Sequence, residues 1–152
     1  SNERDWLAEC GVLPRATIEG DRIVINNVRH FRYAEGAVAE ARYDTREYDL
    51  ATLRSVDFLM SYFGSDAIAH TFLSFGFENG EYLAVSAEIR KEKGESFAPL
   101  PGCFKRYELM YVFGDERDVI GLRLYERKEQ VYLYRTNVTP EDARALLRDY
   151  LE

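Results

Sequence analysis

Short apolar runs are spaced along the first two thirds of the chain, and apolar residues repeat with a helical period at its end. Short runs rich in aromatic and β-branched residues favour strands. A Gly20-Asp21 turn between two such runs predicts a hairpin, whereas residues 34–44 show no period. Further strands are predicted over residues 46–50, 56–63, 107–113 and 131–135.

The clearest hairpin lies in the middle of the sequence. Strand-like runs over residues 67–77 and 81–92 flank Glu78-Asn79-Gly80, and Asn-Gly is a strong turn signal. Residues 115–118 read as a charged turn. At the end, Thr139 and Pro140 predict the start of a helix, and its apolar stripe comprises Ala143, Leu146, Leu147, Tyr150 and Leu151. We predict an α+β fold, a mostly antiparallel sheet with flanking helices.

Composition and charge narrow the possible partners. A chain of 152 residues is typical of one domain, and the formal net charge of −7 opposes both phosphate backbones and anionic lipid headgroups. We therefore expect no nucleic-acid partner and no membrane binding by this segment itself. The two histidines and two cysteines are not at metal-ligand spacing, and no Gly-rich phosphate loop follows a strand, so we expect no metal and no cofactor.

His70 is the strongest candidate for chemistry, because it lies in the predicted hairpin among apolar residues. The alternative is a core histidine bonded to a backbone carbonyl. A two-residue loop at Asn79-Gly80 places His70 opposite Ile89, whereas a three-residue loop places it opposite Glu88 with Ser86 on the same face. We predict the second register, which is typical of a catalytic base beside its orienting groups. A solvated surface charge is the alternative for Glu88.

The candidate nucleophiles are Cys10 and Cys103. Cys103 lies near Lys105 and Arg106, whose charge favours a thiolate, but a free cysteine also serves as a small apolar side chain. We predict that the two cysteines are not bridged. His30 has no comparable surroundings, and we interpret it as a surface or packing residue.

Six segments, in order along nearly the whole chain, resemble the Lnb N-terminal periplasmic domain family. They are VRHFRY at 28–33, YDL at 48–50, AHTFLSFGF at 69–77, SAEIRKEKGE at 86–95, YELMYVFGDERDV at 107–119 and VYLY at 131–134. The resemblance implies a circularly permuted papain-like fold related to NlpC-type thiol enzymes. It also implies that His70 matches the catalytic histidine of the family.

The function implied by this resemblance is acyl transfer. Members named for function are bacterial lipoprotein N-acyltransferases, in which a Cys-His pair moves an acyl chain from a phospholipid to the amino terminus of a lipoprotein. The alternatives are an NlpC-like cell-wall amidase or peptidase, which uses the same residues, and a binding or scaffold module without catalysis.

The same resemblance bears on the extent of the chain. The family cysteine lies in an Asn-Cys-Thr-Thr motif that this sequence lacks, and the predicted last helix has no stop signal. We therefore expect residues 13–152 to be the histidine part of a periplasmic domain truncated before its cysteine motif, inactive by itself. Residues 1–12 read as an extension that includes a tag remnant, and relatives imply a membrane tether through flanking helices.

Overall fold

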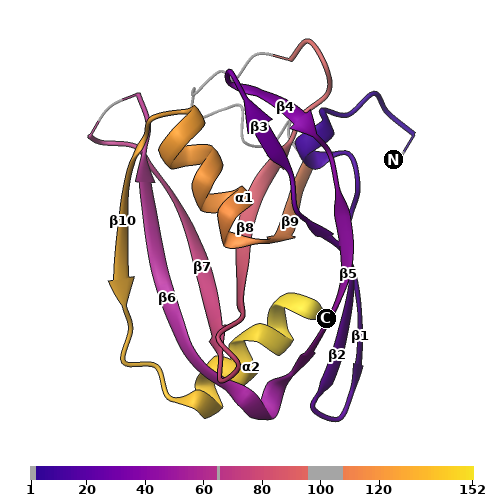
Figure 1. Cartoon of the computed structure of the whole chain (residues 1–152), viewed down its shortest axis with the longest axis vertical. Coiled ribbons are helices and arrows are strands. Elements are labelled where there is room, and N and C mark those ends of the chain that lie inside the picture. The colour runs from indigo at the N-terminus through magenta and orange to yellow at the C-terminus, as the bar shows by residue number, and fades with distance from the viewer. Residues whose placement is uncertain (1–2, 65, 96–107) are drawn as a thin grey trace.

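The strands form an eight-stranded sheet that is antiparallel except for one parallel pairing, between β2 and β9 (Figure 1). The computed structural model describes residues 3–64, 66–95 and 108–152. The order across the sheet is β1 (Arg15–Glu19), β2 (Arg22–Arg29), β9 (Glu108–Gly114), β8 (Tyr82–Arg90), β7 (Ala69–Phe77), β6 (Leu53–Tyr62) and β10 (Gln130–Arg135), with β5 (Tyr43–Asp49) also paired to β2.

The strands predicted from the sequence are confirmed, and the region without a period contains more strands. Residues 34–44 include β4 (Ala37–Glu40), which pairs with β3 (Arg32–Ala34) in a separate two-stranded sheet. The turn between them is made by Glu35 and Gly36, which both have positive φ. These strands are short and mostly exposed, so they lack the apolar alternation that makes a strand recognisable.

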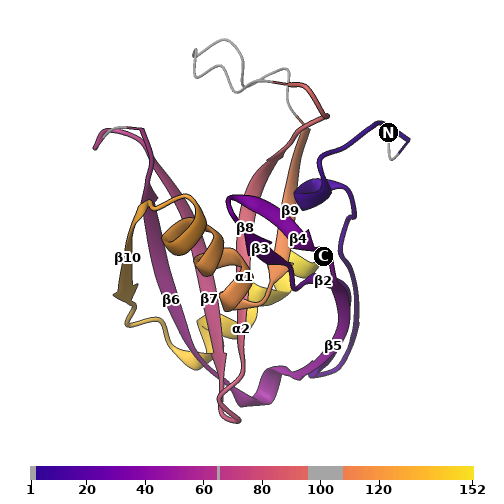
Figure 2. The same ribbon diagram turned by 45° about the horizontal axis from the view of Figure 1, so that its top comes forward.

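Two α-helices pack on opposite faces of the sheet, in an α+β arrangement. Leu83 and Val85 of β8 pack in one apolar cluster with α2 (Pro140–Leu151), whereas Ala84 packs with Val119 of α1 (Glu116–Gly121). Successive side chains of a strand point to opposite faces, so the helices lie on opposite sides of β8. Figures 1 and 2 show β10, β6 and β7 at one side of the molecule and β1, β2 and β5 at the other.

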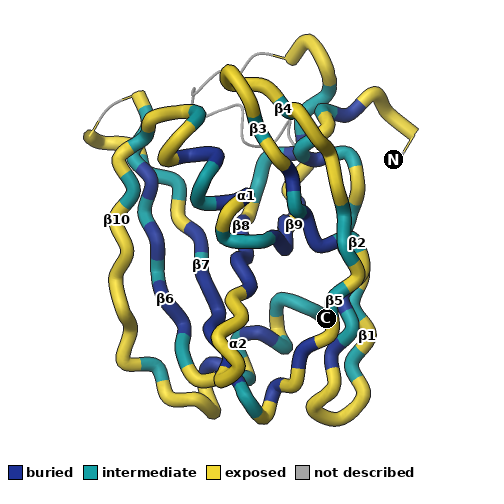
Figure 3. The backbone as a smooth tube through the Cα atoms, viewed as in Figure 1, coloured by how far each residue is buried: buried dark blue, intermediate teal, exposed yellow. Residues whose placement is uncertain are grey.

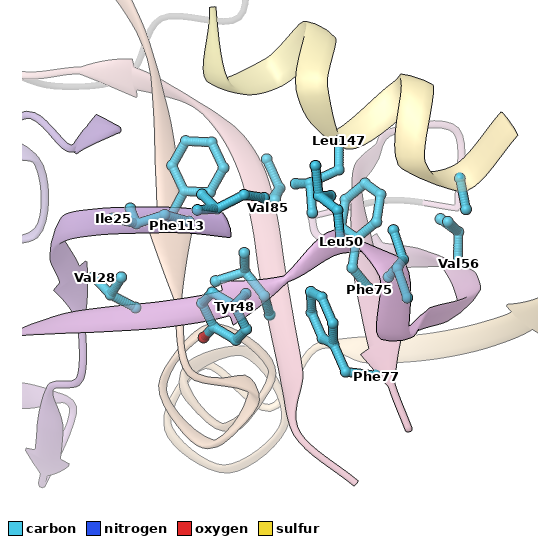
Figure 4. Close-up of a cluster of buried hydrophobic side chains, with 14 residues drawn as sticks. Ile25, Val28, Tyr48, Leu50, Val56, Phe75, Phe77, Val85, Phe113 and Leu147 are labelled. Carbon is cyan, nitrogen blue, oxygen red and sulfur yellow. The ribbon is translucent and has the colours of Figure 1, made fainter. Parts of the chain in front are cut away.

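The main core lies on the α2 face. Figure 4 shows its side chains, which come from strands at both sides of the sheet and from the helix. Leu147 is fully buried, as the helical stripe predicts, and the Thr139 hydroxyl caps the helix by accepting from the Asp142 amide at 3.1 Å. Burial falls towards the outer strand β10, which is exposed over most of its length (Figure 3).

The charged turn predicted at residues 115–118 is wrong, because these residues begin α1. Asp115 accepts a hydrogen bond from the Arg117 amide at 2.9 Å, as an N-cap does. The helix continues into a π-helical turn, η4 (Leu122–Glu126). Six residues are too few to show a helical period in the sequence.

The N-terminal segment packs on the domain. Trp6 and Cys10 are buried, and the Leu7 amide donates to the Lys91 carbonyl at 2.9 Å. Short 3-10 helices cover Ala8–Cys10 (η1) and Leu50–Thr52 (η2). The residues expected from the sequence to be an extension are therefore in contact with the last residues of the hairpin that carries His70.

Candidate active site

The β7–β8 hairpin has the register predicted from its three-residue loop. The Phe77 amide donates to the Glu81 carbonyl at 3.0 Å, and Gly80 takes the left-handed conformation with φ of 82°. Phe72 pairs with Ser86, so the next position on the same face sets His70 opposite Glu88. The alternative register, with His70 opposite Ile89, is excluded.

Ser86 and Glu88 both contact the same nitrogen of His70. The Nε2 atom lies 2.7 Å from the Ser86 hydroxyl oxygen and 3.3 Å from Glu88 Oε1. The Ser86 hydroxyl donates to Glu88 Oε1 at 2.7 Å. Because the Ser86 hydroxyl proton is already donated to Glu88, the Ser86 oxygen can only accept a hydrogen bond from His70. A neutral His70 therefore carries its proton on Nε2.

The other nitrogen of His70 keeps its lone pair. Within the described ranges of the chain, no group makes a hydrogen bond to His70 Nδ1. The ring is 18% exposed and packs beside Phe72, at 5.9 Å between ring centroids. The imidazole is therefore fixed at one nitrogen and able to accept a proton at the other.

Arg123 supplies a charge that the sequence did not reveal. Its guanidinium donates to Glu88 Oε1 at 3.1 Å and to Glu129 Oε2 at 3.0 Å. Burial raises the pKa of Glu88, but the hydrogen bond and charge of His70 and the charge of Arg123 outweigh burial and hold this pKa well below its usual range. Glu88 is therefore a carboxylate at neutral pH.

His70, Glu88 and Arg123 line a cavity of about 360 Å³. Its walls combine apolar and charged side chains from the N-terminal segment, the sheet and η4. The remaining lining residues are Leu7, Glu9, Cys10, Arg29, Phe63, Ala87, Ile89, Lys91, Val119, Leu122, Arg127 and Glu129.

Cys10 lines this cavity, but its thiol is not activated as a nucleophile. Its Sγ accepts from the Lys91 amide at 3.3 Å and donates to the Lys91 carbonyl at 3.4 Å, and burial raises the pKa of the thiol. A protonated, hydrogen-bonded thiol is a weak nucleophile. Cys10 is unbridged, and Cys103 lies outside the described residues.

A buried ion pair supports the cavity from the α1 side. Asp118 is fully buried and accepts two hydrogen bonds from Arg29, both at 2.9 Å. It also accepts from the Phe31 amide and the Tyr33 hydroxyl, each at 2.8 Å. The sequence analysis did not predict this pair or the helix that carries Asp118, although Asp115 as an N-cap was an available signal.

His30 lies in a different cluster. Its Nδ1 atom is 3.2 Å from Asp44 Oδ2, and Arg42 and Arg46 contact the same nitrogen at 2.8 and 3.2 Å. The side chain is 22% exposed. It is a half-buried packing residue, one of the two interpretations that the sequence left open.

The comparison with protein families matches this chain to the Lnb N-terminal periplasmic domain over residues 39–152. The chain belongs to the Lnb N-terminal periplasmic domain family. The matched range contains every side chain that contacts Nε2 of His70, together with Arg123 and Glu129. No curated protein and no solved structure matches the chain significantly.

The family description assigns Lnb domains to the periplasm, which is an extracytoplasmic location. None of the helices in the described part of the chain is both long enough and apolar enough to cross a membrane.

Proposed function

We propose that this domain carries the catalytic base of an extracytoplasmic thiol acyltransferase. His70 is the general base and then the general acid, and Glu88 and Ser86 orient its ring. The nucleophile is the cysteine that family resemblance assigns to an Asn-Cys-Thr-Thr motif, which does not occur in these 152 residues. By the same resemblance, the donor is a phospholipid and the acceptor is the amino terminus of a lipoprotein.

The observation that carries the proposal is the asymmetry between the two nitrogens of His70. Nε2 is held by Ser86 and Glu88 at 2.7 and 3.3 Å, and Nδ1 has no partner among the described residues. The ring is 18% exposed, and Nδ1 is not among the buried polar atoms that lack a partner in the part of the chain that the structure describes, so this nitrogen is accessible rather than packed in the interior as in a purely structural histidine. A base held by an ionised carboxylate on the wall of a cavity suits proton transfer instead.

The proposed reaction has two acyl-transfer steps. His70 Nδ1 takes the thiol proton, the thiolate attacks the ester carbonyl, and the carbon–oxygen bond breaks while the imidazolium protonates the departing alcohol. The acceptor amine then attacks the thioester, the carbon–sulfur bond breaks, and the amine proton passes through His70 to the thiol. The carboxylate of Glu88 stabilises the imidazolium that forms in each step.

Resemblance also supports the remaining parts of this proposal. The mostly antiparallel sheet would be the β part of a circularly permuted papain-like fold. Helices in flanking segments would tether the domain beside its lipid substrate, which fits a segment whose own net charge of −7 opposes anionic headgroups.

The test uses the full-length protein, including the Asn-Cys segment, with a 4-nitrophenyl ester of a fatty acid as acyl donor. We expect a burst of nitrophenolate and a mass increase of one acyl group on the protein. His70→Gln should slow the burst about 100-fold or more, as general-base loss does. His30→Gln is the matched control, because this histidine lies in the Asp44 cluster, and its burst should be unchanged.

A synthetic peptide with a free amino terminus then distinguishes transfer from hydrolysis. Acyl transfer to the peptide supports the proposal, whereas release of free fatty acid in its presence would favour an amidase or peptidase relative. Acylation that is indifferent to His70, or none at all, would overturn the catalytic role and leave a scaffold.

A further inference from the structure

Arg123 lies between two carboxylates, only one of which touches His70. Its guanidinium bonds Glu88 on one side and Glu129 on the other, at 3.1 and 3.0 Å. Glu129 also accepts from the Ser61 hydroxyl at 2.5 Å, and Ser61 is fully buried. The side chains of Arg123 and Glu129 are only 5% and 9% exposed, so their charges are weakly screened by solvent.

We propose that Arg123 and Glu129 are positioning residues that set the proton affinity of His70 through Glu88. This inference rests on the proposed function, in which His70 is the base. It adds a role for two residues that do not contact the reacting atoms.

Two carboxylates share the charge of one guanidinium. The carboxylate of Glu88 favours the protonated imidazole, and the guanidinium of Arg123 opposes that preference because it neutralises the carboxylate. Glu129 competes for the same guanidinium and so weakens its effect on Glu88. The balance between the two carboxylates therefore decides how readily His70 takes up and releases a proton.

The backbone fixes this balance. Arg123 belongs to the π-helical turn η4, in which the Arg127 amide donates to the Leu122 carbonyl at 2.9 Å. Immediately after it, the Glu129 amide donates to the Arg123 carbonyl, also at 2.9 Å. The two side chains are thus held on one short, hydrogen-bonded segment. Single π-helical turns are frequent at functional sites.

Other titratable and charged residues line the same cavity as His70. They come from the N-terminal segment, from β2 and from the residues that follow β8 and η4. They are Glu9, Cys10, Arg29, Lys91 and Arg127. Arg29 is committed to Asp118, and Arg127 lies 3.9 Å from Glu129. Arg123 is distinguished from these groups by its direct bond to the carboxylate that contacts Nε2.

The test is an NMR titration of ¹⁵N-histidine-labelled protein. The chain has two histidines, so His30 serves as an internal control within each sample. In Arg123→Gln, the titration midpoint of His70 should rise, because Glu88 is no longer neutralised. In Glu129→Gln the midpoint should fall, because Arg123 is then free for Glu88. Arg123→Lys, which keeps the charge, should stay near the parent value.

Opposite shifts from the two variants distinguish this role from a general loosening of the site, which would move both in one direction. Equal shifts, shifts of the reverse sign, or no shift at His70 would overturn the proposal, as would equal movement of His30. Should Arg123→Gln fail to fold, a fall in Glu129→Gln with no change in Arg123→Lys still supports the proposal, and a rise in Glu129→Gln overturns it. The titration needs no nucleophile, so its outcome is separate from that of the acylation test.

Discussion

The two faces of strands β6, β7 and β8 are built from alternating residues of the same segments, yet they differ in chemistry. On the α2 face, Phe75, Leu83 and Val85 pack in an apolar cluster with the helix (Figure 4). The α1 face carries polar side chains between its few apolar contacts, among them Ser61, His70, Ser74, Ser86 and Glu88.

The apolar α2 face mainly stabilises the fold, whereas the polar α1 face carries the candidate site. An apolar face gains free energy from any well-packed side chain of suitable size. A buried polar face is stable only if its buried charges and donors have partners, because an unpaired charge or donor costs several kcal/mol. The α1 face therefore holds the arrangement that a reaction needs, and we expect it to tolerate substitution less well than the α2 face.

The largest predicted effect is on the α1 side. Asp118→Ala removes four hydrogen bonds and leaves the buried guanidinium of Arg29 without its carboxylate. Loss of one partner of a buried ion pair costs about 3–5 kcal/mol, a large share of the stability of a small domain. Urea unfolding followed by circular dichroism should show a decrease of about 4 kcal/mol in the free energy of unfolding.

An exposed ion pair provides the matched control for this variant. Glu47→Ala breaks a bidentate contact with Arg22, but both side chains are more than half exposed. The stability should be nearly unchanged. A loss in Asp118→Ala no larger than that of the control would contradict the view that the α1 face depends on complete pairing.

The second prediction concerns the α2 face. Leu147 is fully buried in the main cluster, so Leu147→Ala loses transfer free energy and leaves a cavity, at a cost of about 3 kcal/mol. The same unfolding experiment measures it. Leu133→Ala on β10 is the control, because this side chain is 50% exposed and should change stability by about 0.5 kcal/mol or less. Similar losses for the two leucines would mean that the cluster is not the main core.

The elements that could be predicted from the sequence are those encoded by neighbouring residues. The hairpin of β7 and β8 and the helix α2 are encoded locally, by a turn signal, a cap and an apolar stripe, and the structure agrees with these predictions. Even the side chains opposite His70 follow from local spacing, because loop length fixes register.

What the sequence did not reveal depends on contacts between distant segments. Arg123 meets Glu88 across 35 residues of sequence, and Arg29 meets Asp118 across 89. Neither pair leaves a periodic pattern, since each charge alone resembles a solvated surface residue. The helix that brings Asp118 inward has six residues, too short for its period to distinguish it from a turn.

The smallest predicted effect tests whether the loop or the faces hold the register beside His70. Gly80 has φ of 82°, and no atom lies within 4 Å of the position that a Cβ would take, so Gly80→Ala should cost about 1 kcal/mol from backbone strain alone. The Gly20→Ala variant, in the hairpin of β1 and β2, is the control: Gly20 has φ of 63° and equally open space, so the cost should be similar.

A one-residue slip of β8 would turn Leu83 and Val85 towards the polar face, which is far costlier than the strain. We therefore expect the His70 imidazole resonances to keep their Nε2-protonated pattern in Gly80→Ala, as in Gly20→Ala. New His70 signals in Gly80→Ala alone, or a loss well above that of its control, would show instead that the turn residue, rather than the contrast between the faces, aligns Glu88 with His70.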